Sequence, residues 1–298
     1  MGTSWVIRER VSPDSVNAGK RCWRQGWTHP ELCPNPRRMT DAARLIPFDG
    51  LTNFRDFGGY RAGDRTIATG RFFRSANHAL ASEADLKRLA AMGIAAVVDL
   101  RRPSERERSP SRRWEGFSAA LIENHDADEG SLSWDAFMGE WDMQAPSYGV
   151  FLTRYYEEAP YLPRILDLFT RYFETLATSE GAVVVHCAAG KDRTGLAVAL
   201  THMMVGVHKD DVVADYLLTN TSGRFETHGA NWREMIRQHR GAAPDMDTMR
   251  YIMSVQPEYL ERSLAVIAER HGGVEGYLRD ALGVDARKRA AIEARLFG

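Results

Sequence analysis

One stretch decides the fold: Val183-Val184-Val185-His186-Cys187-Ala188-Ala189-Gly190-Lys191-Asp192-Arg193-Thr194-Gly195. Its apolar start predicts a buried strand, its small and charged residues predict a short loop, and an apolar helical segment follows from Thr194. Such a loop is an anion site, because its N–H groups converge and the helix dipole adds positive potential. The sequence therefore predicts Cys187 as a thiolate nucleophile and Arg193 as a planar clamp for two phosphate oxygens.

The segments around this stretch predict an α/β fold. A helical stripe follows the capping residues Ser82 and Asp85, and the apolar run from Ile94 to Leu100 predicts a second strand. An amphipathic helix from Ile165 to Leu176 leads into the central strand. Alternating strands and helices imply a central, mainly parallel sheet flanked by helices, and the chain beyond Asp210 predicts a helical C-terminal half.

In such a sheet, ligands bind beyond the carboxyl ends of the strands. If the strand that ends at Leu100 runs parallel to the central strand, Arg101 emerges at the same edge as Cys187. We therefore expect Arg101 to add positive charge to the rim of the pocket.

Three regions differ in character along the chain. Residues 1–38 carry scattered tryptophans and prolines without periodicity, and we expect a disordered leader or an upstream extension, with a docked arm as the alternative. Residues 39–298 are expected to form the one folded domain of the chain. Within it the pattern weakens at about 105–150, a stretch too long for a plain connector, which predicts a lid or insertion.

The composition excludes several classes of protein. There are 39 Lys and Arg residues against 40 acidic ones, so no overall basic charge favours nucleic acid. The three cysteines show no spacing typical of zinc sites or disulfide frameworks, which favours a reducing compartment. No apolar run approaches the length of a membrane span or of a signal peptide core. We expect a cytoplasmic protein without metal or cofactor, and leave open export that uses no such signal.

The loop does not fit a nucleotide-binding P-loop. That motif needs Gly where Val185 stands and Ser or Thr where Asp192 stands. What remains is Cys, five residues, Arg and then Thr, a loop short enough to wrap one phosphate.

The segment His186 to Gly195 resembles the signature of cysteine-dependent protein tyrosine phosphatases. The Gly-Lys-Asp-Arg sequence is most similar to their atypical bacterial branch of tyrosine and phosphoinositide phosphatases, as are segments Asn53 to Gly59 and Asp215 to Leu218. The resemblance covers about residues 51–298. It implies that Cys187 attacks phosphorus to give a phosphocysteine, which water then hydrolyses.

The resemblance also assigns roles to the neighbours of the nucleophile. Thr194 stabilises the thiolate, and His186 orients the loop. The expected phosphate-binding residues are Ala188, Ala189, Gly190, Lys191, Thr194 and Gly195. Arg55 and Asp56 are expected to support the loop as an ion pair, with an ordinary surface pair as the alternative.

The residues leave two assignments of the general acid open. The atypical branch resembles lipid phosphatases that carry the acid inside the loop, which favours Asp192. Many tyrosine phosphatases instead use an Asp on a separate mobile loop, and this leaves Asp126 and Asp128 as alternatives.

The substrate follows from the loop charge. Phosphotyrosine is the expected substrate, and Lys191 favours phosphoinositides in addition, with phosphoserine and phosphothreonine also open. The rival functions are a rhodanese-like sulfurtransferase and a phosphate-binding pseudophosphatase without activity.

Overall fold

The computed structural model describes residues 44–126 and 134–298. The core of the described chain is a five-stranded sheet in the order β1-β4-β7-β5-β6. Its strands are β1 (Arg55–Asp56), β4 (Phe72–Ser75), β7 (Ala182–His186), β5 (Ile94–Asp99) and β6 (Ala120–Ile122). Strand β1 is antiparallel to β4 and the other pairings are parallel, so the predicted α/β class with a mainly parallel sheet is confirmed. A separate hairpin joins β2 (Arg61–Ala62) and β3 (Arg65–Thr66).

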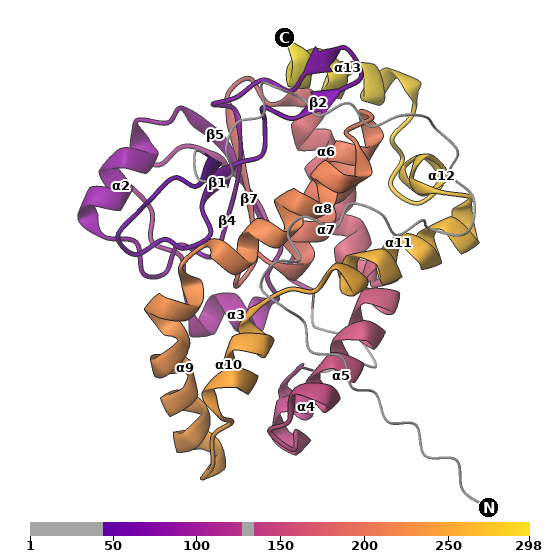
Figure 1. Ribbon diagram of the computed structural model, residues 1–298. Helices are drawn as coiled ribbons and strands as arrows, with labels where there is room; N and C mark the ends of the chain where they lie inside the picture. The colour runs from indigo at the N-terminus through magenta and orange to yellow at the C-terminus, as the bar shows by residue number, and fades with distance from the viewer. Residues whose placement is uncertain (1–43, 127–133) are drawn as a thin grey trace, which may run out of the picture. The chain divides into compact units, whose positions relative to one another are not determined.

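Helices cover both faces of the sheet. Figure 1 shows α2 (Glu83–Ala90) on one side and α6 (Pro163–Thr178) with α7 (Asp192–Met204) on the other. Ser82 caps α2 in the predicted capping box with Asp85. Alternate residues of a strand point to opposite faces, so Val184 packs in the cluster with α2, whereas Val183 and Val185 pack in the larger cluster.

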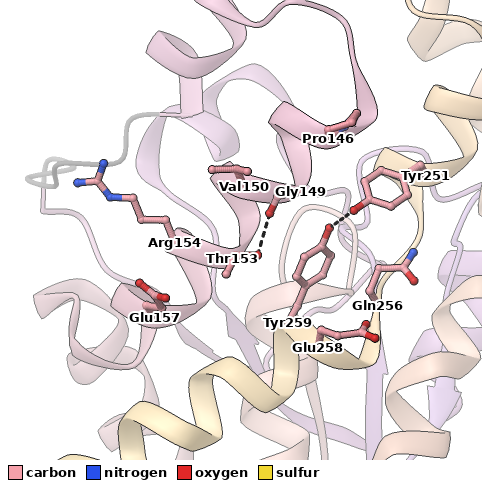
Figure 2. A pocket seen from close by; sticks show the side chains of 10 residues that line it. All are labelled: Pro146, Gly149, Val150, Thr153, Arg154, Glu157, Tyr251, Gln256, Glu258 and Tyr259. Atoms are coloured by element: carbon pink, nitrogen blue, oxygen red, sulfur yellow. Dashed lines mark hydrogen bonds between the residues drawn. The ribbon is translucent and has the colours of Figure 1, made fainter. Parts of the chain in front are cut away.

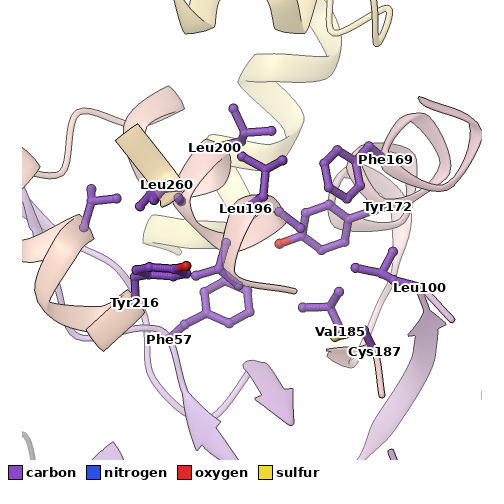
Figure 3. Close-up of a cluster of buried hydrophobic side chains, with 14 of the residues drawn as sticks. Phe57, Leu100, Phe169, Tyr172, Val185, Cys187, Leu196, Leu200, Tyr216 and Leu260 are labelled. Atoms are coloured by element: carbon purple, nitrogen blue, oxygen red, sulfur yellow. The ribbon is translucent and has the colours of Figure 1, made fainter. Parts of the chain in front are cut away.

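Helix α7 begins directly at the predicted loop and is buried on nearly all sides. Its buried side chains contact those of α6 and of the later helices in one hydrophobic cluster, part of which Figure 3 shows. In that view Cys187 lies beside Val185 and Leu100 at the edge of the cluster. The apolar packing around α7 therefore fixes the start of the helix, and with it the end of the loop.

The region expected as an insertion, at about 105–150, is only partly separate from the sheet. It contains α3 (Pro103–Arg108), strand β6, α4 (Trp134–Glu140) and the first part of α5 (Ala145–Glu158). Strand β6 pairs with β5 in register, so this part of the region belongs to the central sheet. Residues 1–38 lie outside the described residues.

The C-terminal half is helical, as predicted. The elements are η2 (Ala159–Tyr161), α8 (Lys209–Leu217), η3 (Leu218–Thr221), α9 (Arg224–Arg240), α10 (Met246–Met253), α11 (Pro257–His271), α12 (Val274–Asp280) and α13 (Ala286–Phe297). Among the described residues, no helix has the length and apolar character needed to cross a membrane.

Candidate active site

Cys187 lies at the carboxyl end of the central strand, where β7 leads into the loop before α7. Cys187 is almost fully buried. His186 is in register with Ser75 of β4 and with Asp99 of β5, so residues that follow both neighbouring strands surround the loop. The strand order therefore places Cys187 at the position where parallel sheets bind ligands.

The loop carbonyls are held from outside the loop. Ala188 O accepts from Asn77 N at 3.1 Å and from Asn77 Nδ2 at 2.9 Å. Asn53 Nδ2 donates to Ala189 O at 3.1 Å and to Gly190 O at 2.9 Å. Within the described chain, the N–H groups of residues 188–191 have no protein acceptor. Fixed carbonyls and free N–H groups are the arrangement that an anion cradle requires.

Two glycines are required by the close packing of the loop. Gly190 has φ +66°, and a Cβ atom there would lie 2.3 Å from Ser75 O. At Gly195 a Cβ atom would lie 2.7 Å from the ring of Tyr216. Only glycine fits the first position on both conformational and steric grounds.

A buried ion network supports the loop from below. Asp215 of α8 pairs with Arg74 at 2.6 Å and with Arg55 at 3.3 Å, and Arg74 also donates to Gly190 O at 2.9 Å. Arg55 holds the side chain of Asn53 by a further hydrogen bond. Burial alone would raise the pKa of Asp215, but the two arginine charges hold that pKa well below its usual value.

The expected pair of Arg55 with Asp56 does not form. Arg55 acts through Asn53 and Asp215, both of which contact or support the loop. Asp56 instead accepts from the N–H groups of Gly58 and Gly70 at 2.7 and 2.5 Å. Neighbouring strand residues point to opposite faces, which is why Arg55 and Asp56 do not share partners.

Arg193 is held by a carboxylate that sequence reasoning missed. Its guanidinium binds Glu105 of α3 through two hydrogen bonds, at 2.6 and 2.8 Å, and donates to Leu100 O at 3.1 Å. Burial would lower the pKa of Arg193, but the Glu105 charge outweighs it and raises that pKa well above its usual value. Glu105 lies at the third position of α3, and Pro103 at the first position is a sequence signal for a helix start. No neighbouring residue in the sequence, however, indicates that Glu105 pairs with Arg193.

Asp192 faces an aromatic wall. Tyr156 of α5 donates to Asp192 Oδ1 at 2.8 Å, and its hydroxyl also lies 2.7 Å from that of Tyr216. Tyr259 stacks on Tyr156 with ring centroids 5.5 Å apart. Burial, followed by the Asp192 charge, raises the pKa of Tyr156 well above its usual value. The hydroxyl therefore stays protonated and orients the Asp192 carboxylate.

A surface hollow adjoins this wall. It has a volume of about 610 Å³ and lies between α5 and the start of α11. Figure 2 shows Tyr251 and Tyr259 side by side at its edge, with their hydroxyls 2.8 Å apart. Tyr259 thus connects the hollow to the pair of Tyr156 and Asp192.

Lys191 is turned away from the role expected of it. Its ammonium donates to Ile252 O at 2.8 Å, Ser254 O at 3.2 Å and the Tyr148 hydroxyl at 3.2 Å. An ammonium has three protons, and all three have protein acceptors. Lys191 therefore ties the loop to the end of α10, and its charge does not extend into the pocket as a free hydrogen-bond donor.

Arg101 also departs from its expected position. It is buried, and its guanidinium binds Asp99, Ser109 O at 2.6 Å and Ser111 Oγ at 2.8 Å. Its charge is directed to these partners instead of to the rim of the pocket. The backbone of Arg101 follows the end of β5, as the sequence predicted. Its side chain, however, pairs with the buried carboxylate of Asp99, two residues earlier.

His186 lies under the loop in a fully buried position. Its Nδ1 is 3.2 Å from Cys187 O, and its ring stacks on His78 with centroids 4.9 Å apart. Burial lowers the pKa of His186 to about 4 even though Asp99 Oδ2 is 3.7 Å from its Nε2. The ring is therefore neutral at pH 7, which suits an orienting role better than proton transfer.

The remaining predicted residues are placed as follows. The hydroxyl of Thr194 is buried and has no hydrogen-bond partner among the described residues. Asp126 is exposed and bound to Asn124, whose amide also binds Asp167. Asp128 lies outside the described residues. Of the three acid candidates, Asp192 is the one that belongs to the loop itself.

Comparison with known proteins identifies the family. The sequence pattern of the tyrosine phosphatase family matches residues 46–298. A candidate tyrosine-protein phosphatase of Cupriavidus necator is 36% identical over 247 residues, which cover 80% of this chain and 85% of that protein. Triple specificity protein phosphatase PtpB of Mycobacterium tuberculosis is 33% identical over 267 residues, which cover 80% of this chain and 94% of PtpB. The chain belongs to the tyrosine phosphatase family and is a cysteine-dependent phosphatase.

Proposed function

We propose that this phosphatase hydrolyses phosphotyrosine and other phosphate monoesters through a phosphocysteine on Cys187. The observation that carries the proposal is the loop itself, in which the carbonyls are bound from outside and the N–H groups of residues 188–191 have no protein acceptor among the described residues. Phosphoserine, phosphothreonine and phosphoinositides are included as substrates, because one relative is named for three specificities. A cytoplasmic location is part of the proposal and rests on the cysteine pattern of the sequence.

In the first step the Cys187 thiolate forms a bond to phosphorus as the bond from phosphorus to the leaving oxygen breaks. The loop N–H groups and Arg193 bind the equatorial oxygens, where negative charge gathers in the transition state. Glu105 holds the guanidinium by two bonds, so Arg193 needs little reorientation when the phosphate arrives.

Asp192 supplies the proton that the leaving oxygen takes up. In the second step water attacks phosphorus, the bond to sulfur breaks, and the Asp192 carboxylate takes the proton from water. Tyr156 keeps the carboxyl oriented in both steps.

The nucleophile is tested with Cys187→Ser, which removes the thiolate. We expect loss of activity toward para-nitrophenyl phosphate and a phosphotyrosine peptide by at least about 10³-fold. Purified Cys187→Ser protein that retains wild-type turnover would refute the proposed intermediate.

The acid is tested by the dependence of rate on the leaving group. Asp192→Asn should slow substrates with poor leaving groups, such as alkyl phosphates, about 10²-fold more than activated aryl phosphates. Asp126→Asn is the matched control, since that exposed carboxylate lies outside the loop. An Asp126→Asn rate that depends on the leaving group, with a normal Asp192→Asn rate, would transfer the acid role to Asp126.

A further inference from the structure

Arg224 is a buried cation with unused hydrogen-bonding capacity. The residue is 6% exposed and stands at the first position of α9. Within residues 44–126 and 134–298, its side chain makes one hydrogen bond, a long contact of 3.4 Å from a terminal nitrogen to Met253 O. Its guanidinium lies 5.0 Å from the centre of the Trp232 ring. Among the described residues it has no carboxylate partner. Buried arginines are normally paired, so this arrangement needs an explanation.

The free N–H groups of Arg224 are not sealed in the core. The fully enclosed, unpaired side-chain nitrogens of the described chain include those of Arg44 and Arg74 but none of Arg224. The remaining donors of Arg224 therefore keep some contact with solvent.

Arg224 lies next to the phosphate loop. It binds the carbonyl of Met253, while Lys191 of the loop binds the carbonyls of the residues on either side, Ile252 and Ser254. Both cations thus share the C-terminal end of α10. Burial lowers the pKa of Arg224, and the negative charge of Asp192, beside the loop, opposes that effect.

The two cations differ in what they offer a substrate. The ammonium of Lys191 uses all three of its protons on protein acceptors. In the part of the chain that the structure describes, Arg224 makes a single long hydrogen bond, and it retains a fork of donors that can bind a phosphate through two oxygens.

We propose that Arg224 binds a second phosphate of the substrate, carried on the same small molecule as the phosphate that Cys187 attacks. The substrate class is a polyphosphorylated polyol, either free or as a lipid headgroup. This proposal rests on the proposed function, because the first phosphate has to occupy the Cys187 loop. Arg224 is then a specificity residue. Lys191 holds the loop against the C-terminal end of α10, to which Arg224 is also bound.

The test compares substrates that differ by one phosphate. Phosphate release is measured on the three short-chain phosphatidylinositol monophosphates and the three bisphosphates, and on the corresponding free inositol phosphates, with para-nitrophenyl phosphate as a reference. The readout is the ratio of kcat/KM for the best bisphosphate to that for the best monophosphate. The variants are Arg224→Met, Arg224→Lys and, as a control, Arg237→Met, which removes an exposed arginine from the same helix.

We expect wild type to favour a bisphosphate by about tenfold, the scale of a charge-assisted hydrogen bond, and Arg224→Met to bring the ratio close to one. Arg224→Lys should restore part of the preference, and Arg237→Met should keep all of it. If bisphosphates are preferred among both the free inositol phosphates and the lipids, Arg224 recognises the headgroup alone. If they are preferred only among the lipids, the substrate is the lipid form.

Two results would overturn the proposal: a wild-type ratio near one, or a ratio in Arg224→Met within twofold of wild type. Failure of the proposed function is distinct, because wild type would then release no phosphate from any substrate or Cys187→Ser would remain active. If Arg224→Met does not fold, Arg224→Gln provides the same measurement. Binding of inositol bisphosphate to the Cys187→Ser protein by calorimetry gives a readout without turnover, and we expect Arg224→Met to weaken it about tenfold.

Discussion

At the scale of single residues, the pair of Arg193 and Glu105 carries the most consequence. Two short hydrogen bonds fix the plane of the guanidinium before any substrate arrives, and the partner comes from α3 instead of from the loop. Both side chains are largely buried, with exposed fractions of 11% and 15%. A charge pair of this kind positions the clamp more than it stabilises the fold.

Glu105→Gln keeps the size of the side chain but removes its charge. We expect kcat/KM to fall by about a hundredfold toward para-nitrophenyl phosphate, because a clamp that is no longer aligned loses transition-state contacts. Glu105→Asp should be less affected, since it retains the charge. Glu107→Gln, at an exposed position of the same helix, is the control. Equal rates in Glu105→Gln and Glu107→Gln would mean that Arg193 is held by other contacts.

At the scale of elements, the phosphate loop depends on the segment after β4 as much as on its own residues. Ser75 O occupies the space where a side chain at Gly190 would stand, and Asn77 binds Ala188 O. The backbone at Gly190 is also in the left-handed region, with φ +66°. The positive φ angle and the close contact with Ser75 O are two separate constraints at Gly190. Gly206, which has a positive φ angle without such a contact, allows their effects to be distinguished.

Gly190→Ala should lower kcat about a hundredfold, because the new Cβ atom displaces the loop from Ser75. Gly206→Ala is the matched control: Gly206 has φ +85°, but a Cβ atom there meets nothing within 4 Å. Gly206→Ala should lose about 1 kcal/mol of stability from the strained backbone, and Gly190→Ala should lose more because its Cβ atom also clashes with Ser75 O. Only Gly190→Ala should lose activity. Steady-state kinetics with urea unfolding checks both effects. Wild-type turnover in Gly190→Ala would show that the loop tolerates the displacement.

At the scale of the whole molecule, the stability should depend on pH through the buried histidines. His186 has a pKa of about 4 in the folded chain, below the ordinary value of 6.5. The unfolded chain therefore binds a proton that the folded chain excludes as the pH falls from 6.5 to 4. The contribution of His186 to stability is complete above pH 6.5, and it is lost progressively down to about pH 4. The loss amounts to about 3 kcal/mol.

Urea unfolding between pH 7 and pH 4 measures how the free energy of unfolding depends on pH. His186→Asn should reduce this dependence but leave the part that comes from His78 and His202, whose pKa values burial also lowers. His239→Asn, at an exposed position, should leave it unchanged. The carboxylates Asp99 and Asp215, whose pKa values are lowered, lose their contribution below pH 4 and so lie outside the window. A slope that is the same in His186→Asn and wild type would assign the acid sensitivity to other groups.

The sequence predicted what is encoded locally. The strand, loop and helix around Cys187 follow from one continuous stretch, and the family follows from the same residues. What the sequence did not predict is set by contacts between distant segments. Lys191 turns to the carbonyls at the end of α10, and Arg193 to Glu105, because those partners are brought there by tertiary packing. The region at about 105–150 looked separate because β6 is short and its pairing with β5 leaves no periodic signal.

The position of β7 has a consequence for how the protein is made. Strands β1 and β4 form one pair, β5 and β6 form another, and β7 alone joins the two pairs. It is also the last strand of this sheet to leave the ribosome, after the whole stretch between Asp99 and Ala182 has been synthesised. Until then the edges of β4 and β5 that pair with β7 have no partner strand in this sheet, and unpaired edges favour mispairing with other chains. Completion of the sheet and delivery of the nucleophile are therefore a single event, and a chain released early has neither a closed core nor a reactive cysteine.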